Sequence, residues 1–459
     1  MAKVPARIRP AMKLTFLGST DEVTGSRYLL ETEKARILID CGLFQSEKCC
    51  EANNAEPMGF DASKLDAVFL THAHADHSGL LPRLVKEGYA GAIYMTEPTI
   101  GLTKLILDDS YEIMSEQAEE QGEDVLYSES DLESTYKLFH SANYHEQISV
   151  KDATVMFHDA GHILGSAFAS VRANGKCIVF SGDIGNANVP ILPETERISE
   201  ADAIVCESTY GHRVHESVEQ RNDILQAVIK ESVFKNGVLL IPSFSIERTQ
   251  ELLYAINQIL KNFKTDVPIY LDSPMAIKAT ELYRHYQQYL LFDSPILQEP
   301  DRDFFSFPNL RETIKKDESK TINEAPKPKI IIAGSGMMNG GRILHHLVRY
   351  LQDANSTVLI IGFQAKGTLG RKIYEGAKRV NILGKDLSVR AQIKAIGAFS
   401  AHADQAKLTE WLMPESGVHA KQIFLVHGEP DVKQIFQTHL RHNLKSEILI
   451  PKFNQTFTI

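Results

Sequence analysis

Three histidines and an aspartate stand within six consecutive positions, directly after a short apolar run. The segment reads His72-Ala73-His74-Ala75-Asp76-His77, and it follows the run Ala67–Leu70. Zinc in proteins is bound by imidazole nitrogen and carboxylate oxygen, among other donors, and a loop that leaves a strand can turn several such groups toward one point. We therefore interpret these four residues as ligands of a metal centre rather than as a solvated turn.

Two further candidate ligands stand close to the ends of other apolar runs. His162 lies in Gly161-His162-Ile163-Leu164-Gly165, and Asp183 follows the run Cys177–Phe180. A polar side chain at the end of a buried strand is more informative than one on a surface. Both residues are therefore added to the candidate centre, whereas isolated histidines such as His140 are interpreted as surface or packing residues.

The composition is that of a globular protein. The chain has 459 residues, 43% of them hydrophobic and 24% charged, and this length favours two domains. A net charge of −10 opposes non-specific attraction to nucleic acid, although a local basic groove can coexist with it. Five cysteines, including Cys49-Cys50, show no CxxC spacing, which fits a reducing cytoplasm without structural disulfides. No apolar run approaches the roughly 18 residues that span a bilayer, so we expect neither secretion nor membrane insertion.

The order of the expected elements changes twice along the chain. Short β-rich runs dominate up to Gly211, strand-like and helical stretches alternate beyond it, and histidine-bearing strand ends return after about Lys394. Alternation of strands and helices is typical of a parallel sheet. We predict an α/β domain at 212–394, inserted between the two parts of a metal domain at 1–211 and 395–459. The acidic stretch Asp108–Glu133 is predicted to be a solvated helical excursion.

The candidate ligands form a known pattern. The segment His72–His77, with His162, Asp183 and the upstream Asp40, resembles the motifs of the metallo-β-lactamase superfamily, which implies a four-layer αββα sandwich. The resemblance implies two Zn²⁺ ions, the first held by His72, His74 and His162 and the second by Asp76, His77 and His427. It further implies that Asp183 bridges the two ions and that Asp40 orients a ligand imidazole from behind it.

Three downstream segments narrow the resemblance. Glu207 in Glu207-Ser208-Thr209-Tyr210, His402 in Ser400-Ala401-His402-Ala403-Asp404 and His427 in Val426-His427-Gly428 are similar to motifs A, B and C of the β-CASP nucleases. This family includes the nuclease subunit of the eukaryotic cleavage and polyadenylation complex and its bacterial and archaeal relatives. The resemblance makes Asp76, His402 and Glu207 catalytic, with His402, held by Glu207, as general acid for the leaving 3′ oxygen. A histidine at motif C favours RNA over DNA, and the alternative for Glu207 is an ordinary cap or turn residue.

A glycine-rich loop suggests where nucleic acid would bind. The run Lys329–Ala333 leads into Gly334-Ser335-Gly336-Met337 and a helix from Arg342, and such a strand, loop and helix start can bind phosphate through backbone N–H groups. A dinucleotide site is disfavoured because no acidic residue follows the next strand. Surface ion pairing is the alternative for each cation in this set. The expected phosphate contacts are Arg248, Ser335, Gly336, Met337, Lys366 and Arg371.

These observations predict a zinc-dependent ribonuclease that hydrolyses single-stranded RNA, as an endonuclease, a 5′ exonuclease or both, by a two-metal mechanism. The inserted domain is expected to close over the metals as a slot for single strands. A homodimer is compatible with the sequence. The alternatives are a hydrolase of a small ester or thioester, a DNA-directed nuclease and a non-catalytic RNA-binding subunit.

Overall fold

The computed structural model describes residues 11–45, 54–122, 124–215, 218–263, 265–290, 304–417 and 419–459. The chain divides into two compact units. Unit 1 comprises Met1–Ile184, Thr195–Arg213 and His402–Ile459, and unit 2 comprises Gly185–Glu194 and Val214–Ala401. The border between the units after Arg213 lies two residues after the predicted boundary at 211/212. The border after Ala401 lies seven residues after the predicted boundary at 394/395. Residues Gly185–Glu194, which the prediction assigned to the metal domain, group with unit 2.

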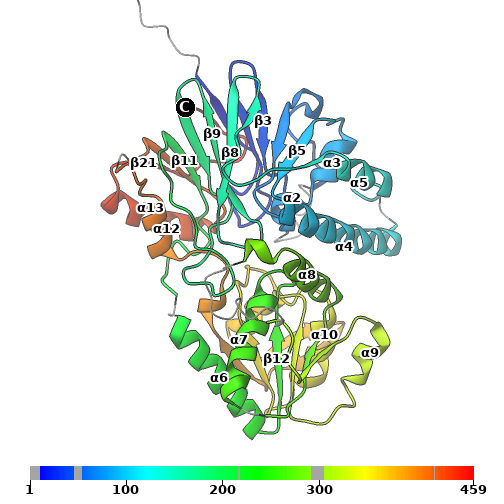
Figure 1. Cartoon of the computed structure of the whole chain (residues 1–459). Helices are drawn as coiled ribbons and strands as arrows, with labels where there is room; N and C mark the ends of the chain where they lie inside the picture. Colours follow the sequence, from blue (N-terminus) through cyan, green and yellow to red (C-terminus); the bar gives the residue numbers. More distant parts are fainter. Residues whose placement is uncertain are drawn as a thin grey trace, which may run out of the picture. The chain divides into compact units, whose positions relative to one another are not determined.

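Unit 1 contains two seven-stranded sheets (Figure 1). The first has the order β22-β1-β2-β3-β4-β5-β6 and the second the order β21-β20-β11-β10-β9-β8-β7. The strands of the first sheet are β1 (Lys13–Phe16), β2 (Tyr28–Glu31), β3 (Arg36–Ile39), β4 (Ala67–Phe69), β5 (Ala92–Met95), β6 (Phe139–Ser141) and β22 (Thr456–Thr458). Those of the second are β7 (Ile148–Val150), β8 (Ala153–Asp159), β9 (Ala167–Ala173), β10 (Lys176–Phe180), β11 (Ala203–Cys206), β20 (Gln422–Leu425) and β21 (Glu447–Leu449).

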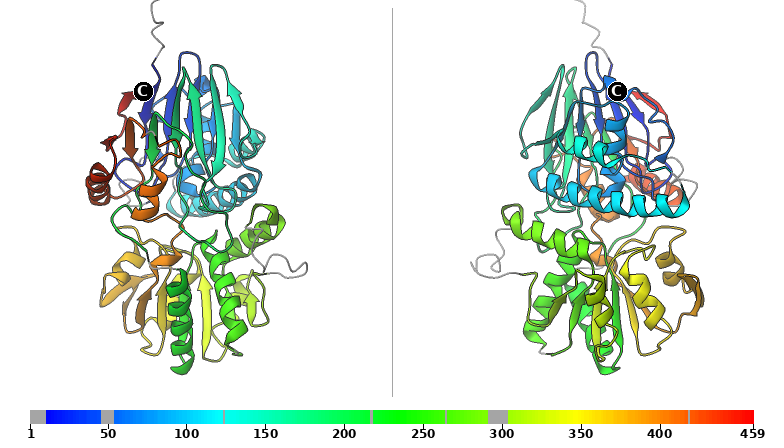
Figure 2. Two further views of the ribbon diagram at one scale, coloured as in Figure 1. Left: turned by 60° about the vertical axis from the view of Figure 1, so that its left-hand side comes forward. Right: turned by 90° about the vertical axis from the view of Figure 1, so that its right-hand side faces the viewer.

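Helices cover the outer faces of both sheets (Figure 2). Between the sheets, Phe16 and Phe69 of the first pack in one core with Phe157 and Phe180 of the second. On the far face of the first sheet lies α3 (Leu81–Lys86), and on that of the second lie α12 (Gln405–Trp411) and α13 (Pro430–Asn443). Each apolar face is thereby buried against another layer. The predicted αββα sandwich is confirmed.

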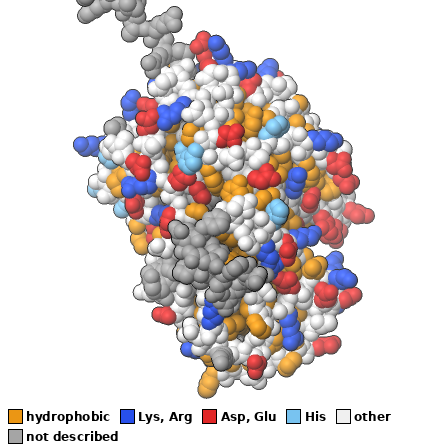
Figure 3. Space-filling view, viewed as in Figure 1, with side chains coloured by type: hydrophobic (Ala, Val, Ile, Leu, Met, Phe, Trp, Pro, Cys, Tyr) orange, Lys and Arg blue, Asp and Glu red, His pale blue; other side chains and the backbone are white. Residues whose placement is uncertain are grey.

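The acidic stretch is helical and solvated, as predicted. Helix α4 (Glu97–Gln121) begins at Thr96, whose side chain accepts from the Thr99 N–H, and α5 (Glu129–Tyr136) follows it. The exposed acidic residues described in this stretch are Asp108, Glu112, Glu116, Glu119, Glu120, Asp124, Glu129 and Glu133. Asp and Glu side chains gather over this side of unit 1 (Figure 3). Their mutual repulsion is relieved by water.

Unit 2 is an α/β unit around one parallel sheet of order β14-β13-β15-β12-β16-β19. Strands β12 (Val238–Pro242) and β15 (Lys329–Ala333) are buried at every position, as expected for central strands covered on both faces. The other strands of this sheet are β13 (Ile269–Leu271), β14 (Leu310–Glu312), β16 (Thr357–Ile360) and β19 (Gln392–Ala395). A separate antiparallel pair is formed by β17 (Arg379–Ile382) and β18 (Lys385–Ser388). The helices are α6 (Val218–Phe234), α7 (Arg248–Asn262), α8 (Pro274–His285), α9 (Lys316–Thr321), α10 (Arg342–Tyr350) and α11 (Leu369–Tyr374).

Two remaining observations concern chemistry expected from the sequence. Cys41, Cys177 and Cys206 are buried free thiols, and the pair Cys49-Cys50 lies outside the described residues. Among the helices that the structure describes, none combines the length and the apolar character needed to cross a bilayer.

Candidate metal centre

The candidate ligands lie where strands of the two sheets end. Asp40 follows β3, and the His72 loop follows β4, which runs parallel to β3. In the second sheet, Asp183, Glu207 and His427 follow the mutually parallel strands β10, β11 and β20. Carboxyl ends of parallel strands open at one edge of a sheet, and side chains placed there converge. His162 joins them from the turn between β8 and β9.

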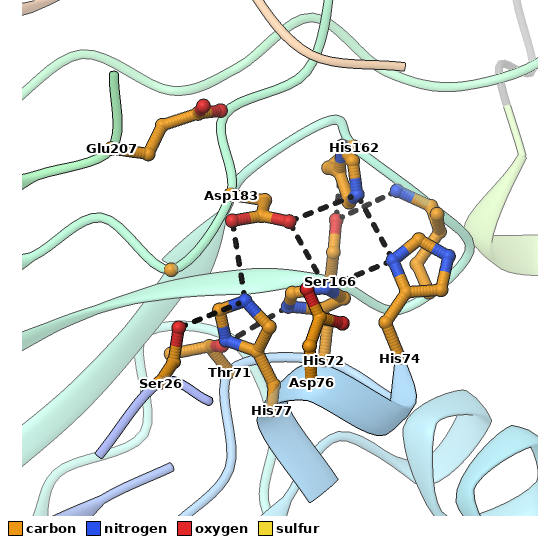
Figure 4. A network of polar contacts seen from close by, with 12 residues as sticks. Ser26, Thr71, His72, His74, Asp76, His77, His162, Ser166, Asp183 and Glu207 are labelled. Carbon is orange, nitrogen blue, oxygen red and sulfur yellow. Dashed lines mark hydrogen bonds and ion pairs between the residues drawn. The ribbon is translucent and has the colours of Figure 1, made fainter. Parts of the chain in front are cut away.

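The two carboxylate oxygens of Asp183 face two different groups of ligands (Figure 4). Oδ2 lies 3.4 Å from His72 Nε2 and 3.5 Å from His162 Nε2. Oδ1 lies 3.3 Å from His77 Nε2 and 3.7 Å from His427 Nε2. His74 Nδ1 completes the first group at 3.1 Å from His72 Nε2, and Asp76 Oδ2 completes the second at 3.2 Å from His427 Nε2. The structure thus brings all seven predicted ligands together, in the two predicted sets.

The spacing of these atoms fits metal ions. Zinc–nitrogen bonds of 2.0–2.1 Å in a tetrahedron place neighbouring ligand atoms about 3.3 Å apart. Four of the six distances between the ligand atoms of the first group are 3.1 to 3.5 Å, and all six are within 4.8 Å. Asp183 Oδ1 and His162 Nδ1 are buried without a hydrogen-bond partner among the described residues. A buried oxygen aimed at converging imidazoles is explained by a cation between them.

Side chains behind the ligands select which ring nitrogen faces the centre. His77 donates from Nδ1 to Asp40 Oδ2 over 2.7 Å, so that Nε2 points to Asp183. Asp40 is fully buried and also accepts from the backbone N–H and the hydroxyl of Thr71. The hydroxyl of Thr209 lies 3.1 Å from His427 Nδ1 in the same way. Asp40 therefore lies where the resemblance expects it, whereas sequence reasoning missed Thr71 and Thr209.

Two glycines allow the close backbone approach that this centre requires. Gly165 has φ +77°, and a Cβ there would lie 2.7 Å from Thr96 Oγ1. Gly182, directly before Asp183, has φ +51°, and a Cβ there would lie 2.7 Å from the Cβ of Thr71. Both positions combine a left-handed backbone with no room for a side chain, which only glycine accepts without strain.

His402 and Glu207 form a pair beside Asp183. Glu207 is fully buried, and its Oε1 lies 3.2 Å from His402 Nδ1 and accepts from the Ile184 N–H. Its Oε2 accepts from the Thr209 N–H. His402 Nδ1 also lies 3.8 Å from Asp183 Oδ2. The carboxylate of Glu207 is therefore held in place to orient the imidazole, which is not the geometry of an ordinary cap.

The charges of the centre separate its imidazoles into two kinds. Burial lowers the pKa of His74 to about 3 and that of His162 well below its usual value, which favours the neutral form that binds metal. Burial also lowers the pKa of His77, but Asp183 and Asp40 outweigh it, and the net pKa is raised. Burial also lowers the pKa of His402, but Glu207 and Asp183 outweigh it, and the net pKa is raised. A histidine that keeps its proton near neutral pH is suited to act as an acid.

One predicted phosphate contact is corrected by the structure. Arg248 is 3% exposed and is paired with Glu247 and Glu251 inside unit 2, where it also donates to the Phe399 carbonyl. A guanidinium that is buried and paired inside the unit does not serve as a surface contact for phosphate. We therefore withdraw Arg248 from the expected RNA contacts. The buried ion pairs of Arg248 are not apparent from the local sequence.

The glycine-rich loop satisfies much of its own hydrogen bonding. Ser335 Oγ accepts from the N–H groups of Asn339 and Gly340, and the Met338 N–H donates to the Ser335 carbonyl. These donors are consequently not available for a phosphate cradle. The Gly370 N–H donates to the Met337 carbonyl, so the loop and α11 lie together. Lys366 is exposed, and Arg371 is paired with Glu375.

Family models match most of the chain in three parts. The metallo-beta-lactamase superfamily matches residues 20–195, the Beta-Casp domain residues 249–373, and the Zn-dependent metallo-hydrolase RNA specificity domain residues 386–451. Fold and centre together define a metal-dependent hydrolase of the metallo-β-lactamase superfamily.

Relatives narrow the class further. Ribonuclease TTHA0252 of Thermus thermophilus is 36% identical over 92% of this chain and 94% of its own length. An RNase J-like protein of Methanocaldococcus jannaschii is 31% identical over 95% of this chain and 97% of its own length. The transcription termination factor FttA of Methanosarcina mazei is 31% identical over 91% of this chain and 67% of its own length. A crystal structure of a protein of unknown function from Enterococcus faecalis V583 shares the fold, with a TM-score of 0.56 at 12% identity over 98% of this chain and all of that one. The chain belongs to the β-CASP family of this superfamily.

Proposed function

We propose that this protein is a zinc-dependent ribonuclease that hydrolyses phosphodiester bonds of single-stranded RNA with two metal ions. The observation that carries the proposal is the carboxylate of Asp183, which faces two histidine ligands with each of its oxygens, beside the His402–Glu207 pair. The names of the relatives and the RNA specificity domain support RNA as substrate.

Each residue set has a separate task. His72, His74 and His162 would hold one ion, Asp76, His77 and His427 the other, and Asp183 both. Bound zinc supplies a hydroxide near neutral pH and polarises a phosphoryl oxygen. The charge that Asp183 and Asp76 bring offsets the positive charge of two ions in a buried site.

His402 would deliver the proton. With Nδ1 turned to Glu207, the ring gives its Nε2 proton to the leaving 3′ oxygen, and Glu207 stabilises the charge of the donor before transfer. Glu207 does so from a fixed position because two backbone N–H groups hold its carboxylate. The two residues together form a positioned acid, which hydrolysis of an RNA strand requires because its leaving alkoxide is a strong base.

The test is cleavage of a single-stranded RNA labelled at its 5′ end. The same sequence as DNA and as an RNA duplex is run beside it, with metal-loaded protein and with His402→Ala of equal metal content. We expect cleavage of the single-stranded RNA alone, slowed by about 10² to 10⁴-fold in the variant. A released labelled mononucleotide indicates 5′ exonuclease action, and longer labelled products indicate endonuclease action.

The matched control is His442→Ala, an exposed histidine on α13 whose Nδ1 donates to the Thr438 carbonyl. It should cleave as the unaltered protein does. Failure of fully metal-loaded protein to cleave any RNA would refute the proposal, and equal rates with and without His402 would refute the assigned acid. A cytoplasmic location, a homodimer and the domain boundaries at 211/212 and 394/395 stay predictions from the sequence.

A further inference from the structure

Two histidines and a glutamate converge on the surface of unit 1, apart from the metal centre. His145 Nε2 lies 3.2 Å from Glu196 Oε1, and His158 Nδ1 lies 3.7 Å from Glu196 Oε2. One ligand atom from each of the three residues lies within 4.8 Å of the others. None of the three takes part in the hydrolytic chemistry proposed above. Their convergence therefore calls for a separate explanation.

The spacing resembles that of the main centre. The carboxylate–imidazole distances of 3.2 and 3.7 Å bracket the 3.4 and 3.5 Å between Asp183 and its two histidines. The rings of His145 and His158 are 5.5 Å apart at 78°, and those of His72 and His162 are 5.0 Å apart at 80°. In both groups two imidazoles meet edge to face beside one carboxylate, an arrangement that a tetrahedral ion can occupy, although His145 and His158 face different oxygens of Glu196.

His158 is held in the orientation of a ligand. Its Nε2 lies 2.9 Å from the hydroxyl of Ser170, and its ring stacks on Phe168 with an interplanar angle of 12°. When Nε2–H donates to Ser170, the lone pair of Nδ1 points toward Glu196. This is the support that metal-binding histidines have behind them. His158 is only 16% exposed, so its ring has little freedom to turn away.

Glu196 is fixed as firmly. Its backbone N–H donates to the Asp159 carbonyl, and its carbonyl accepts from the indole of Trp411. Its Oε1 accepts from the Asp159 N–H. Burial raises the pKa of Glu196, but the contacts with His158 and Asp159 outweigh it and lower the pKa, so the carboxylate is ionised. An ionised carboxylate is the form that binds a cation.

His145 supplies the most exposed of the three ligands. Its side chain is 60% exposed, and its backbone has φ +64° in a turn held by the bond from its N–H to the Phe157 carbonyl. Ion pairs of such exposed groups contribute little by themselves. Two neutral imidazoles and one carboxylate, with open positions left for water, are instead a common ligand set for zinc.

We propose that His145, His158 and Glu196 form a third, peripheral site for Zn²⁺. Its role is structural. The ion ties residue 196 to strand β8 and to the turn at residue 145, and thereby braces the Asp159–Gly161 backbone that leads to His162. The proposal does not depend on the ribonuclease activity.

The experiment measures zinc per chain in the full-length protein. Protein already loaded at the main centre is equilibrated with excess ZnCl₂, freed of unbound metal and analysed by mass spectrometry. The variants are His145→Asn, which suits the left-handed backbone, and Glu196→Gln, which keeps the shape of the side chain. We expect one further zinc in the unaltered protein and in the control His140→Asn, and its loss from both site variants with the main centre still filled. Ser170→Ala should weaken the third site by about 10 to 100-fold.

A second readout is independent of activity and of stoichiometry. Anomalous scattering at the zinc edge from crystals grown with ZnCl₂ should give a peak between the three side chains. The proposal is overturned if the unaltered protein takes up no further zinc or if His145→Asn takes up as much. Retention of the further zinc by Glu196→Gln would also overturn the proposal, because it would show that the carboxylate of Glu196 is not a ligand of the ion.

Discussion

Asp40→Asn should weaken one metal position much more than the other. The carboxylate of Asp40 accepts three hydrogen bonds, from His77 Nδ1, the Thr71 N–H and the Thr71 hydroxyl. An amide of the same shape has one acceptor oxygen and one donor nitrogen. If its oxygen faces His77, its nitrogen meets the Thr71 N–H, and if it is turned over, its nitrogen meets the proton of His77. Either orientation leaves two donors facing each other.

The magnitude follows from that one lost bond. A hydrogen bond to a charged group contributes about 1.5–3 kcal/mol, which corresponds to roughly 10- to 140-fold in affinity. The His77 proton could instead move to Nε2. This would also weaken metal binding, because Nε2 is the nitrogen that faces Asp183 and would have to bind the ion. The loss falls on the position of Asp76, His77 and His427. The position of His72, His74 and His162 keeps all of its ligands and their supports.

The assay is metal retention against a graded series of chelator concentrations. Asp40→Asn should release one of its two main-centre zinc equivalents at roughly 10- to 140-fold lower free chelator than the unaltered protein, and the other at an unchanged concentration. The control is Asp152→Asn, since Asp152 accepts from Thr32, Lys34 and Ala35 in a similar way outside the metal centre. Parallel loss of both equivalents, or no change in either, would refute the assignment of Asp40 to one position.

Three other outcomes follow from the same structure. Glu207 raises the pKa of His402, so this pKa should fall in Glu207→Gln. Because the general acid must be protonated to act, the alkaline limb of the pH profile of kcat/KM should shift to lower pH. An alkaline limb at an unchanged pH would contradict this. Gly165→Ala should cost about 1–3 kcal/mol in unfolding experiments and reduce zinc content, whereas Gly376→Ala, at φ +88° but in open space, should keep its zinc; equal zinc content in both would speak against the close approach at Gly165. Asp272→Ala should lower the stability of unit 2 by about 3–5 kcal/mol in urea, because Arg342 and His346 lose a buried partner, while Asp317→Ala at an exposed pair should change little. Burial raises the pKa of Asp272, but its hydrogen bonds outweigh this effect and lower the pKa. The contribution of Asp272 to the free energy of unfolding is therefore present above the ordinary aspartate pKa and is lost as the pH falls toward the lowered pKa. An Asp272→Ala protein that loses stability in acid as the unaltered protein does would contradict this contribution.

The architecture was predictable because its signals are local. Apolar runs such as Lys329–Ala333 and Val238–Pro242 need only their own composition to indicate buried strands, and both are strands in the structure. The acidic stretch beyond Asp108 indicated a solvated helix by its charge and its helical spacing. The grouping of Gly185–Glu194 with unit 2 has no compositional signal along the chain.

The same distinction divides the candidate site. The sequence by itself determined the ligand types of the centre, because three imidazoles and a carboxylate within six residues have few structural uses and the remaining ligands follow strands. Only the tertiary structure decided which oxygen of Asp183 faces which group, that Arg248 is buried and paired inside unit 2, and that Ser335 closes its own loop. It alone brought His145, His158 and Glu196 together across 51 positions (196 − 145) of chain. Spacing along a chain reports chemistry that one loop can assemble, whereas charge pairing and convergence between distant segments arise only when the layers pack.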